Sequence, residues 1–279
     1  MTTPAVEPDS YVLGRSAEEY RRLVAQARIL ESATQRALQD AGLTAGQSAL
    51  DVGCGPCEVM RLMAERVGAT GKVTGIDRDA GLGAHALGEL RRAGLDMCRF
   101  IAADASTLES IAGEPFDLVF ARLFLFHVKD PVTLLRRMWR WVRPGGTLLV
   151  MDYDLLVAAS TPHDPTIERA LEMTTEAFRA AGCHVDIGAR LPQLFRDAEL
   201  GHAADFRLNE MHQPAAATTA MLRSLLTSLR DTLVHSGIAD SLALHRLDGD
   251  LAAAASGSAI CRWPDLAACW QRKPLTTPA

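Results

Sequence analysis

The chain has 279 residues, of which 48% are hydrophobic, which is enough to bury a full core in one large domain or two small ones. A net charge of −5 and a pI near 5.9 argue against non-specific binding to nucleic acid. No apolar run reaches the roughly 18 residues of a membrane span, and residues 1–8 lack the features of a signal peptide. We therefore expect a cytoplasmic protein with no nucleic-acid or membrane partner, whose six cysteines are reduced thiols.

The apolar pattern divides the chain into a helical start, an alternating core and a helical end. Residues 16–41 predict one or two helices, and strands alternate with helices from Ser48 to about Tyr153. Asp130-Pro131 and Asp164-Pro165 each place a capping acid before a proline, which is typical of a helix start. Beyond the core, residues 203–211 and 266–271 predict strands, and residues 218–235 and 240–255 predict helices. This alternation favours a doubly wound α/β sheet.

The segment Asp51-Val52-Gly53-Cys54-Gly55-Pro56-Cys57 is the most informative in the chain. It follows the apolar run 48–50 and precedes a helical pattern that begins at Glu58, so it predicts a glycine-rich turn from a strand into a helix. The dinucleotide fingerprint fails because its sixth loop position is Glu58, and the P-loop ending Gly-Lys-Ser/Thr is absent. Cys54 and Cys57 have redox or zinc spacing, but no second Cys or His pair at zinc spacing accompanies them.

Acids recur where the next predicted strands end. The run 72–79 contains Asp77, about twenty residues after the glycines, where a carboxylate can accept hydrogen bonds from ribose hydroxyls. The run 98–105 contains Asp104, and the runs 115–122 and 143–151 predict two further strands. Because parallel strands end at one edge of a sheet, these acids are expected to face a single ligand.

With these strand ends in this order, the chain resembles the class I S-adenosylmethionine (SAM) dependent methyltransferases, whose first motif is Asp-x-Gly-x-Gly. Tyr11–Arg15, Glu19, Arg22, Leu23, Gln26 and Ile187–Pro192 are similar to a bacterial small-molecule branch of this family. The resemblance implies a Rossmann-like doubly wound sheet of seven strands, with the last strand antiparallel between the fifth and sixth. It also implies a single domain, 1–279, with an N-terminal helical lid (1–44), a SAM-binding core (45–212), and a helical insertion with the last strand (213–279).

The same resemblance assigns SAM as cofactor, S-adenosylhomocysteine as product, and a set of binding residues. The glycines allow close approach, Asp77 holds the ribose, Asp104 and Ala105 hold the adenine, and the Ala121 carbonyl holds the amino group. Arg22 or Tyr11 meets the carboxylate, and Asp51 orients the loop. Cys57 replaces a common family glycine, so its Cβ is expected near the methionine part of SAM. The full cofactor set is Tyr11, Arg22, Asp51, Gly53, Cys54, Gly55, Asp77, Arg78, Asp104, Ala105, Ala121 and Arg122.

Two residues are candidates for catalysis. His127 follows the fourth strand and is the best-placed histidine for a general base, although a packing or capping role competes with this. The segment Asp152-Tyr153-Asp154 follows the fifth strand, and one of its residues is expected to face the substrate mouth, with Asp154 as the catalytic candidate. Its two acids without a third ligand are weak evidence for a metal. Ala121-Arg122-Leu123-Phe124 lacks the Asp/Asn-Pro-Pro-aromatic motif of base-amine methylases and the acid of metal-dependent catechol methylases.

Three functions remain open. The first is SAM-dependent methylation of a small metabolite at O, N or C, by an enzyme that could form a homodimer. The second is a SAM-binding enzyme that catalyses a rearrangement or cyclisation without methyl transfer, which Cys57 and the lack of an obvious base keep open. The third is a binding protein without catalysis, which the complete set of ligand-facing acids disfavours.

Overall fold

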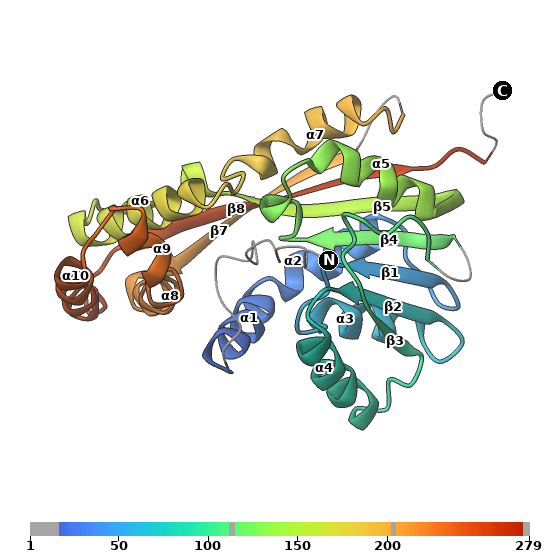
Figure 1. Ribbon diagram of the computed structural model, residues 1–279, viewed down its shortest axis with the longest axis horizontal. Coiled ribbons are helices and arrows are strands. Elements are labelled where there is room, and N and C mark those ends of the chain that lie inside the picture. Colours follow the sequence, from blue (N-terminus) through green and yellow to red (C-terminus); the bar gives the residue numbers. More distant parts are fainter. Residues whose placement is uncertain (1–16, 112–114, 202–204, 276–279) are drawn as a thin grey trace, which may run out of the picture.

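The computed structural model describes residues 17–111, 115–201 and 205–275. Its centre is a sheet of eight strands in the order β3-β2-β1-β4-β5-β8-β6, with β7 also paired to β8 (Figure 1). Strands β1 to β5 run parallel, and β8 runs antiparallel to both β5 and β7. The predicted doubly wound sheet is therefore confirmed, with β8 as the antiparallel strand between the fifth and the predicted sixth. The strands are β1 Ser48–Val52, β2 Lys72–Asp77, β3 Cys98–Ala102, β4 Phe116–Arg122, β5 Val142–Asp154, β6 Ala159–Thr161, β7 Asp205–Pro214 and β8 Ile260–Arg272.

The eighth strand, β6, was not predicted. It pairs with residues 260–262 of β8, just beyond the point where β5 leaves that strand at Asp265. A 3₁₀ turn, η2 (Leu155–Val157), separates β5 from β6. Strand β6 thus pairs with the next part of β8 beyond β5. It has only three residues, which is too short a run to be recognised as a strand in the sequence.

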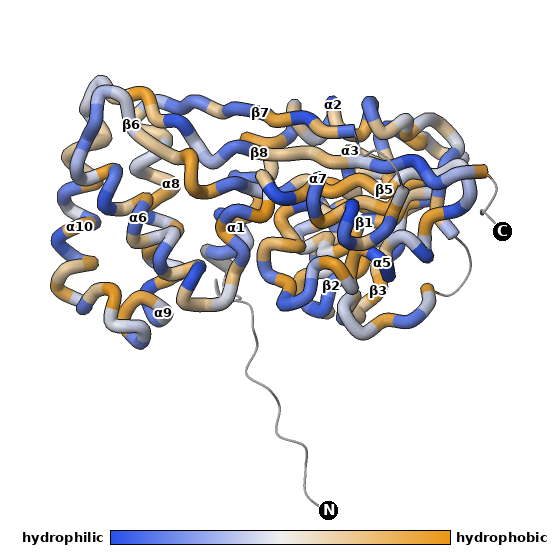
Figure 2. The backbone as a smooth tube through the Cα atoms, turned by 90° about the horizontal axis from the view of Figure 1, so that it is seen from above, coloured by the Kyte–Doolittle hydropathy of each residue, from blue (hydrophilic) through white to orange (hydrophobic). Residues whose placement is uncertain are grey.

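Helices cover the sheet on both faces. Alternate residues of β5 face opposite ways: Leu148 and Val150 belong to the buried cluster of α5 and α7, and Leu149 and Met151 to that of α2 and α3. This burial on two sides explains the nearly continuous apolar strands, which Figure 2 shows in orange near β1 and β5. The helices are α1 Ala17–Ile29, α2 Glu31–Asp40, α3 Glu58–Val67, α4 Ala80–Arg92, α5 Pro131–Trp141, α6 Pro165–Ala180, α7 Ile187–Asp197, α8 Ala215–Ser228, α9 Arg230–His235 and α10 Ser241–Ala254, with the 3₁₀ turn η1 Leu125–His127.

Both predicted helix caps are present. The Asp130 side chain accepts the N–H of Thr133 at 3.0 Å at the start of α5. At the start of α6 the Asp164 side chain accepts the N–H groups of Thr166 and Ile167 at 2.9 and 3.1 Å. These bonds satisfy amides that have no partner in the first turn of a helix.

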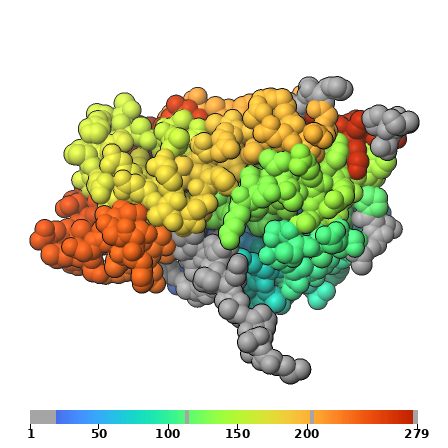
Figure 3. All heavy atoms as spheres, turned by 45° about the horizontal axis from the view of Figure 1, so that its top comes forward, coloured from blue at the N-terminus to red at the C-terminus, as the bar shows by residue number. Residues whose placement is uncertain are grey.

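Helices α6, α8, α9 and α10, called here the lid helices, pack on one another at one end of the molecule. Figure 3 shows them as one lobe, yellow and orange, beside the green and cyan core. Strands β7 and β8 extend from the core sheet to this lobe (Figure 1). The predicted last strand, residues 266–271, was too short because Arg262 and Asp265 interrupt its apolar pattern. In the structure Arg262 pairs with Asp265 at 2.6 Å, and the strand continues through them.

Candidate cofactor and substrate site

A cavity of about 1430 Å³ opens where the parallel strands end. Its walls include Asp51 at the end of β1, Asp77 of β2, Arg122 of β4 and Asp152 of β5. Strands β1 and β4 lie side by side at the centre, where the strand order reverses. Open α/β sheets bind ligands at such a switch point. From this position the cavity extends between the core and helices α1, α6 and α8.

The glycine loop lines the cavity, and at Gly53 it leaves no room for a side chain. Gly53 has a φ of 72°, a left-handed conformation, and a Cβ there would lie 2.4 Å from the Phe124 ring. The N–H groups of Gly53 and Cys54 both donate to the Ile76 carbonyl, at 2.8 and 3.0 Å. Gly55 N–H donates to Asp77 Oδ2 at 3.0 Å. The loop from β1 is thus fixed onto the end of β2.

The expected position of Cys57 beside the ligand is wrong. Its φ of 60° is left-handed, and the thiol is buried, with Sγ 3.9 Å from Cys54 Sγ and 3.7 Å from the Gly55 carbonyl oxygen. Cys57 does not line the cavity, whereas Cys54 does. Both thiols are free, and no group of three metal-ligating side chains occurs in the described part of the chain.

Asp51 is buried, with 1% of its surface exposed, and lines the cavity. Burial raises the pKa of its carboxyl to about 7, with Arg122 opposing the shift and Asp77 adding to it. Its Oδ2 atom has no hydrogen-bond partner among the described residues. Arg122 donates from Nη1 to Thr34 Oγ1 at 2.8 Å, and burial lowers its pKa. An unpaired carboxylate oxygen beside the cavity suits a cationic ligand group.

The two acids predicted for the nucleoside both line the cavity. Asp77 accepts the Asp79 N–H with Oδ1 at 2.9 Å, in addition to its bond from Gly55. Asp104 holds its own turn, with Oδ1 accepting from the N–H and the hydroxyl of Ser106 at 2.8 and 2.5 Å. Each carboxylate oxygen has two lone pairs, so both acids keep acceptor capacity for a ligand.

Arg137 is a residue that the sequence analysis missed. By helical spacing Arg137 lies off the buried face of α5, which includes Leu134 and Met138, and is expected to face solvent. In the structure it lines the cavity, and its Nη1 donates to the Ala105 carbonyl at 3.4 Å. Ala105 is itself buried and lines the cavity. A long side chain on the flank of a helix can turn either way, and the sequence carries no signal for that choice.

Of the two acids in the segment 152–154, Asp152 lines the cavity and the candidate Asp154 does not. Asp152 is fully buried and accepts the N–H groups of Phe126 and Tyr153, both at 3.1 Å. Burial raises its pKa to about 7 against the opposing effect of these bonds. Through Phe126 the carboxylate positions η1, the turn that carries His127.

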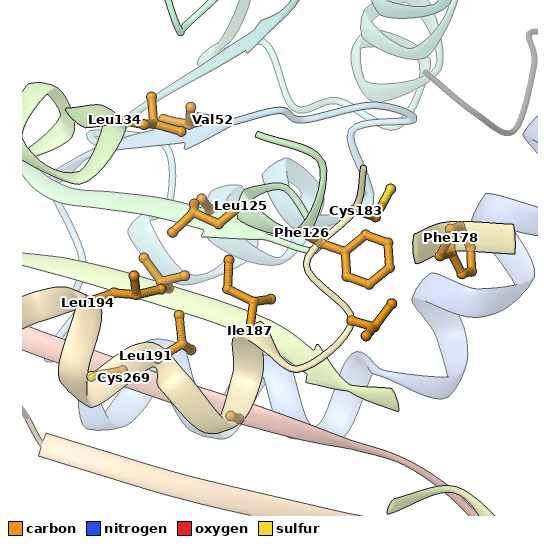
Figure 4. Packing of buried hydrophobic residues seen from close by; sticks show 14 of the residues in the cluster. Val52, Leu125, Phe126, Leu134, Phe178, Cys183, Ile187, Leu191, Leu194 and Cys269 are labelled. Atoms are coloured by element: carbon orange, nitrogen blue, oxygen red, sulfur yellow. The ribbon is translucent and has the colours of Figure 1, made fainter. Parts of the chain in front are cut away.

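His127 lines the cavity. Burial, with Arg78 and Arg22 nearby, lowers its pKa to about 4, so the imidazole is neutral at pH 7. Its Nδ1 lies 3.5 Å from the Cys183 thiol. Figure 4 shows the neighbouring Phe126 ring facing Phe178 of α6, edge to face with centroids 5.0 Å apart.

The remaining predicted residues lie in different places. Asp154 does not line the cavity: its side chain turns to accept the Leu156 N–H at 3.1 Å and caps η2. Arg22 lines the cavity and is paired with Glu19, from Nε at 2.8 Å and from Nη2 at 2.6 Å. Arg78 lines the cavity, Ala121 is fully buried inside β4, and Tyr11 lies outside the described residues.

The fold and this site define a Rossmann-like α/β protein with a cavity at the ends of its parallel strands. Residues 50–150 match the family model described as a methyltransferase domain. The matched segment, residues 50–150, belongs to the class I SAM-dependent methyltransferase family, whose methyl donor is SAM and whose product is S-adenosylhomocysteine. The buried carboxylate beside the glycine loop and the two acceptor acids fit such a cofactor. No helix of the described residues is long and apolar enough to cross a membrane.

Similar proteins match in part. Phosphoethanolamine N-methyltransferase 1 of Triticum aestivum is 36% identical over 113 residues, which cover 40% of this chain and 22% of that protein. A Staphylococcus aureus demethylmenaquinone methyltransferase is 30% identical over 118 residues, 42% of this chain and 48% of that protein. The chain thus spans less than half the length of these relatives. A putative methyltransferase from Bacillus halodurans has the same fold, with a TM-score of 0.58 and 15% identity over 87% of this chain and 99% of that chain.

Proposed function

We propose that the protein is a SAM-dependent methyltransferase that acts on a small-molecule metabolite at O, N or C. The observation that carries the proposal is one cavity lined by the glycine loop, by Asp77 and Asp104, and by Asp51, whose buried Oδ2 atom has no hydrogen-bond partner among the described residues. When bound, SAM supplies an electrophilic methyl group for a one-step displacement. The names of the curated relatives give phosphoethanolamine and demethylmenaquinone as their acceptors. These names support a small-molecule acceptor but do not identify it.

We propose the following roles for the cofactor residues, which the family resemblance suggests and, for those that line the cavity, their place in its wall supports. Asp77 accepts the ribose hydroxyls, Asp104 accepts the adenine amino group, and Ala105 offers its backbone N–H. Asp51 attracts the ammonium of the methionine part, and the Ala121 carbonyl accepts from the same group. The remaining cofactor residues (Tyr11, Arg22, Gly53, Cys54, Gly55, Arg78 and Arg122) complete the proposed set.

The chain's catalytic contribution is then mainly positioning. His127 is the proposed group nearest the reaction, held by η1 and by the N–H bond from Phe126 to Asp152. With a pKa of about 4 it is a weak base at pH 7, which favours a role in orienting the acceptor. Asp154 is a weaker candidate for catalysis, because its side chain caps η2 and does not line the cavity. The non-methylating alternative loses support as well, since the Cys57 thiol lies beneath the loop.

The larger organisation remains a proposal too. We propose one methyltransferase domain whose lid combines the N-terminal helices with α6 and α8 to α10. A homodimer stays a prediction, to be tested by sedimentation.

Titration calorimetry with SAM and S-adenosylhomocysteine tests the proposal. We expect Asp77→Asn to weaken SAM binding by about 10- to 100-fold, because two hydrogen bonds lose a charged acceptor. Asp240→Asn is the matched control, since Asp240 caps α10 through Ala243 N–H away from the cavity and asparagine also caps, so its SAM affinity should stay within about 3-fold.

Two outcomes contradict the proposal at different levels. Unchanged SAM affinity in Asp77→Asn rejects the ribose assignment alone. Absence of SAM binding to the unmodified protein rejects the cofactor and with it the function. Mass spectrometry of candidate acceptors incubated with SAM then checks transfer as the gain of one CH₂ unit.

A further inference from the structure

The end of the cavity away from the glycine loop is walled by two of the lid helices. Leu171, Thr174 and Phe178 of α6 recur at spacings of three and four, so they share one helix face, and all three line the cavity. Met221, Leu222 and Leu225 of the neighbouring helix α8 line it as well. The two helices pack against one another, so these residues form one continuous wall.

This wall carries no charge in the described part of the chain. Besides the apolar residues, α6 contributes only Thr174 and Thr175, and β8 contributes Trp263 and Pro264. The arginine and lysine residues that line the cavity come instead from α1 and the core: Arg22, Arg78, Arg122, Lys129 and Arg137.

The charged groups that approach this end already have partners. Glu19 and Arg22 are both buried, at 2% and 7% exposure, and form a two-pronged ion pair. Ser228 of α8 donates its hydroxyl to Glu19 at 2.9 Å. The carboxylate of Asp152 accepts backbone N–H groups. An anionic group bound against the lid would therefore be desolvated without a new cationic partner, which is unfavourable.

One polar atom on this wall is left unsatisfied. Thr174 is 3% exposed, and its Oγ1 is buried without a hydrogen-bond partner among the described residues. The next threonine differs, because Thr175 Oγ1 donates to the Leu171 carbonyl at 2.9 Å. A buried hydroxyl without a partner is costly, and a ligand group that pairs with it removes that cost.

We infer that the acceptor is an uncharged, largely apolar molecule with one hydrogen-bonding group, that it binds between α6 and α8, and that Thr174 bonds to this group. That the bound molecule is a methyl acceptor rests on the proposed function. That it is uncharged and largely apolar rests on the residues of the cavity wall. It separates this chain from an enzyme for phosphorylated amino alcohols, which would need a cation at this wall. Thr174 becomes a specificity-determining residue, and Thr175 does not.

Three probes test the inference by calorimetry on the full chain saturated with S-adenosylhomocysteine. They are 2-naphthol, its analogue 2-methylnaphthalene without a hydroxyl, and phosphoethanolamine. We expect 2-naphthol to bind at least about tenfold more tightly than phosphoethanolamine. Thr174→Val removes the hydroxyl at nearly constant shape and should weaken 2-naphthol by roughly 5- to 10-fold, about one neutral hydrogen bond, while 2-methylnaphthalene changes less than about 2-fold.

Two further variants guard the interpretation. Thr227→Val on α8 is the matched control, because the Thr227 hydroxyl also donates to a carbonyl of its own helix, that of Arg223 at 2.8 Å, and Thr227 does not line the cavity. This variant should alter the binding of neither naphthalene probe. Thr174→Ser keeps the hydroxyl and should bind 2-naphthol within about 2-fold of the unmodified protein, so a packing defect in the valine variant cannot imitate the result. Phosphoethanolamine binding more tightly than 2-naphthol, no binding of either naphthalene probe, or equal losses in Thr174→Val and Thr227→Val would each overturn the inference.

Failure of the proposed function has a different signature. A chain that does not bind S-adenosylhomocysteine but still binds 2-naphthol in a Thr174-dependent way loses the methyltransferase assignment and keeps the lid pocket.

Discussion

The carboxyl of Asp51 lies at the end of β1 between Arg122 and Asp77, and burial raises its pKa from 3.8 to about 7. The folded state therefore binds this proton more tightly than the unfolded chain. Between about pH 4 and pH 7 only the unfolded chain has released it, so the contribution of Asp51 to stability falls as pH rises through that window. The pKa of Asp152 is also raised to about 7, so its contribution to stability falls with rising pH in the same way. Neither buried carboxyl therefore stabilises the fold at neutral pH. For Asp51, the binding of a cationic ligand group would explain why a carboxyl occupies this position.

Measuring SAM affinity at several pH values tests whether Asp51 binds the ammonium group of SAM. Below pH 7 Asp51 must lose its proton to attract the ammonium group, so affinity should fall by up to about tenfold per pH unit between pH 7 and pH 5.5. The measurement is calorimetry at three pH values in that range. Asp51→Asn removes the titrating group and leaves Asp152 in place, so its affinity should vary much less with pH. Equal slopes for the two proteins would show that another group controls the dependence.

At the scale of the single helix, α6 links the capping of a helix to the shape of the pocket. Asp164→Ala removes both hydrogen bonds that cap α6 and should lower the free energy of unfolding by about 1–2 kcal/mol, measured by urea unfolding. Because α6 carries Thr174 and Phe178, the same change should also weaken 2-naphthol binding while SAM affinity stays unchanged.

Asp240→Ala provides the comparison for this prediction. Asp240 caps α10 by accepting the Ala243 N–H at 2.7 Å, so a similar loss of stability is expected. No described residue of α10 lines the cavity, so 2-naphthol binding should be retained. Equal losses of binding in both variants would mean that general loosening of the lid, and not the position of α6, controls the pocket.

The elements that were predicted correctly are those whose signals are local. The core strands follow from apolar runs, and the starts of α5 and α6 follow from an acid before a proline. The site was harder to predict because side-chain direction depends on the backbone. Cys57 turns under the loop because its φ is left-handed, and Asp154 leaves the cavity because the chain enters η2 there. Asp152, two residues earlier, stays inside the strand and lines the cavity.

On the scale of the whole molecule, the lid lobe is joined to the core by the long strands β7 and β8 (Figure 1) and by contacts between helices of the two parts. The contact between α1 and α8 includes the bond from Ser228 to Glu19. The cavity thus lies between two bodies that the sheet connects on one side. A ligand that fills it adds contacts to both bodies and should restrict their relative motion.

Hydrogen exchange read by mass spectrometry can separate the two halves of the cavity. S-adenosylhomocysteine alone should slow exchange in residues 53–57 and 104–107, because it contacts the strand ends. Addition of 2-naphthol should then slow exchange in α6 and α8, where the apolar wall lies, and leave α10 unchanged. Exchange in the lid falls only when the lid itself is contacted, so protection of α6 and α8 by S-adenosylhomocysteine alone would place the cofactor against the lid and contradict the division of the cavity proposed here.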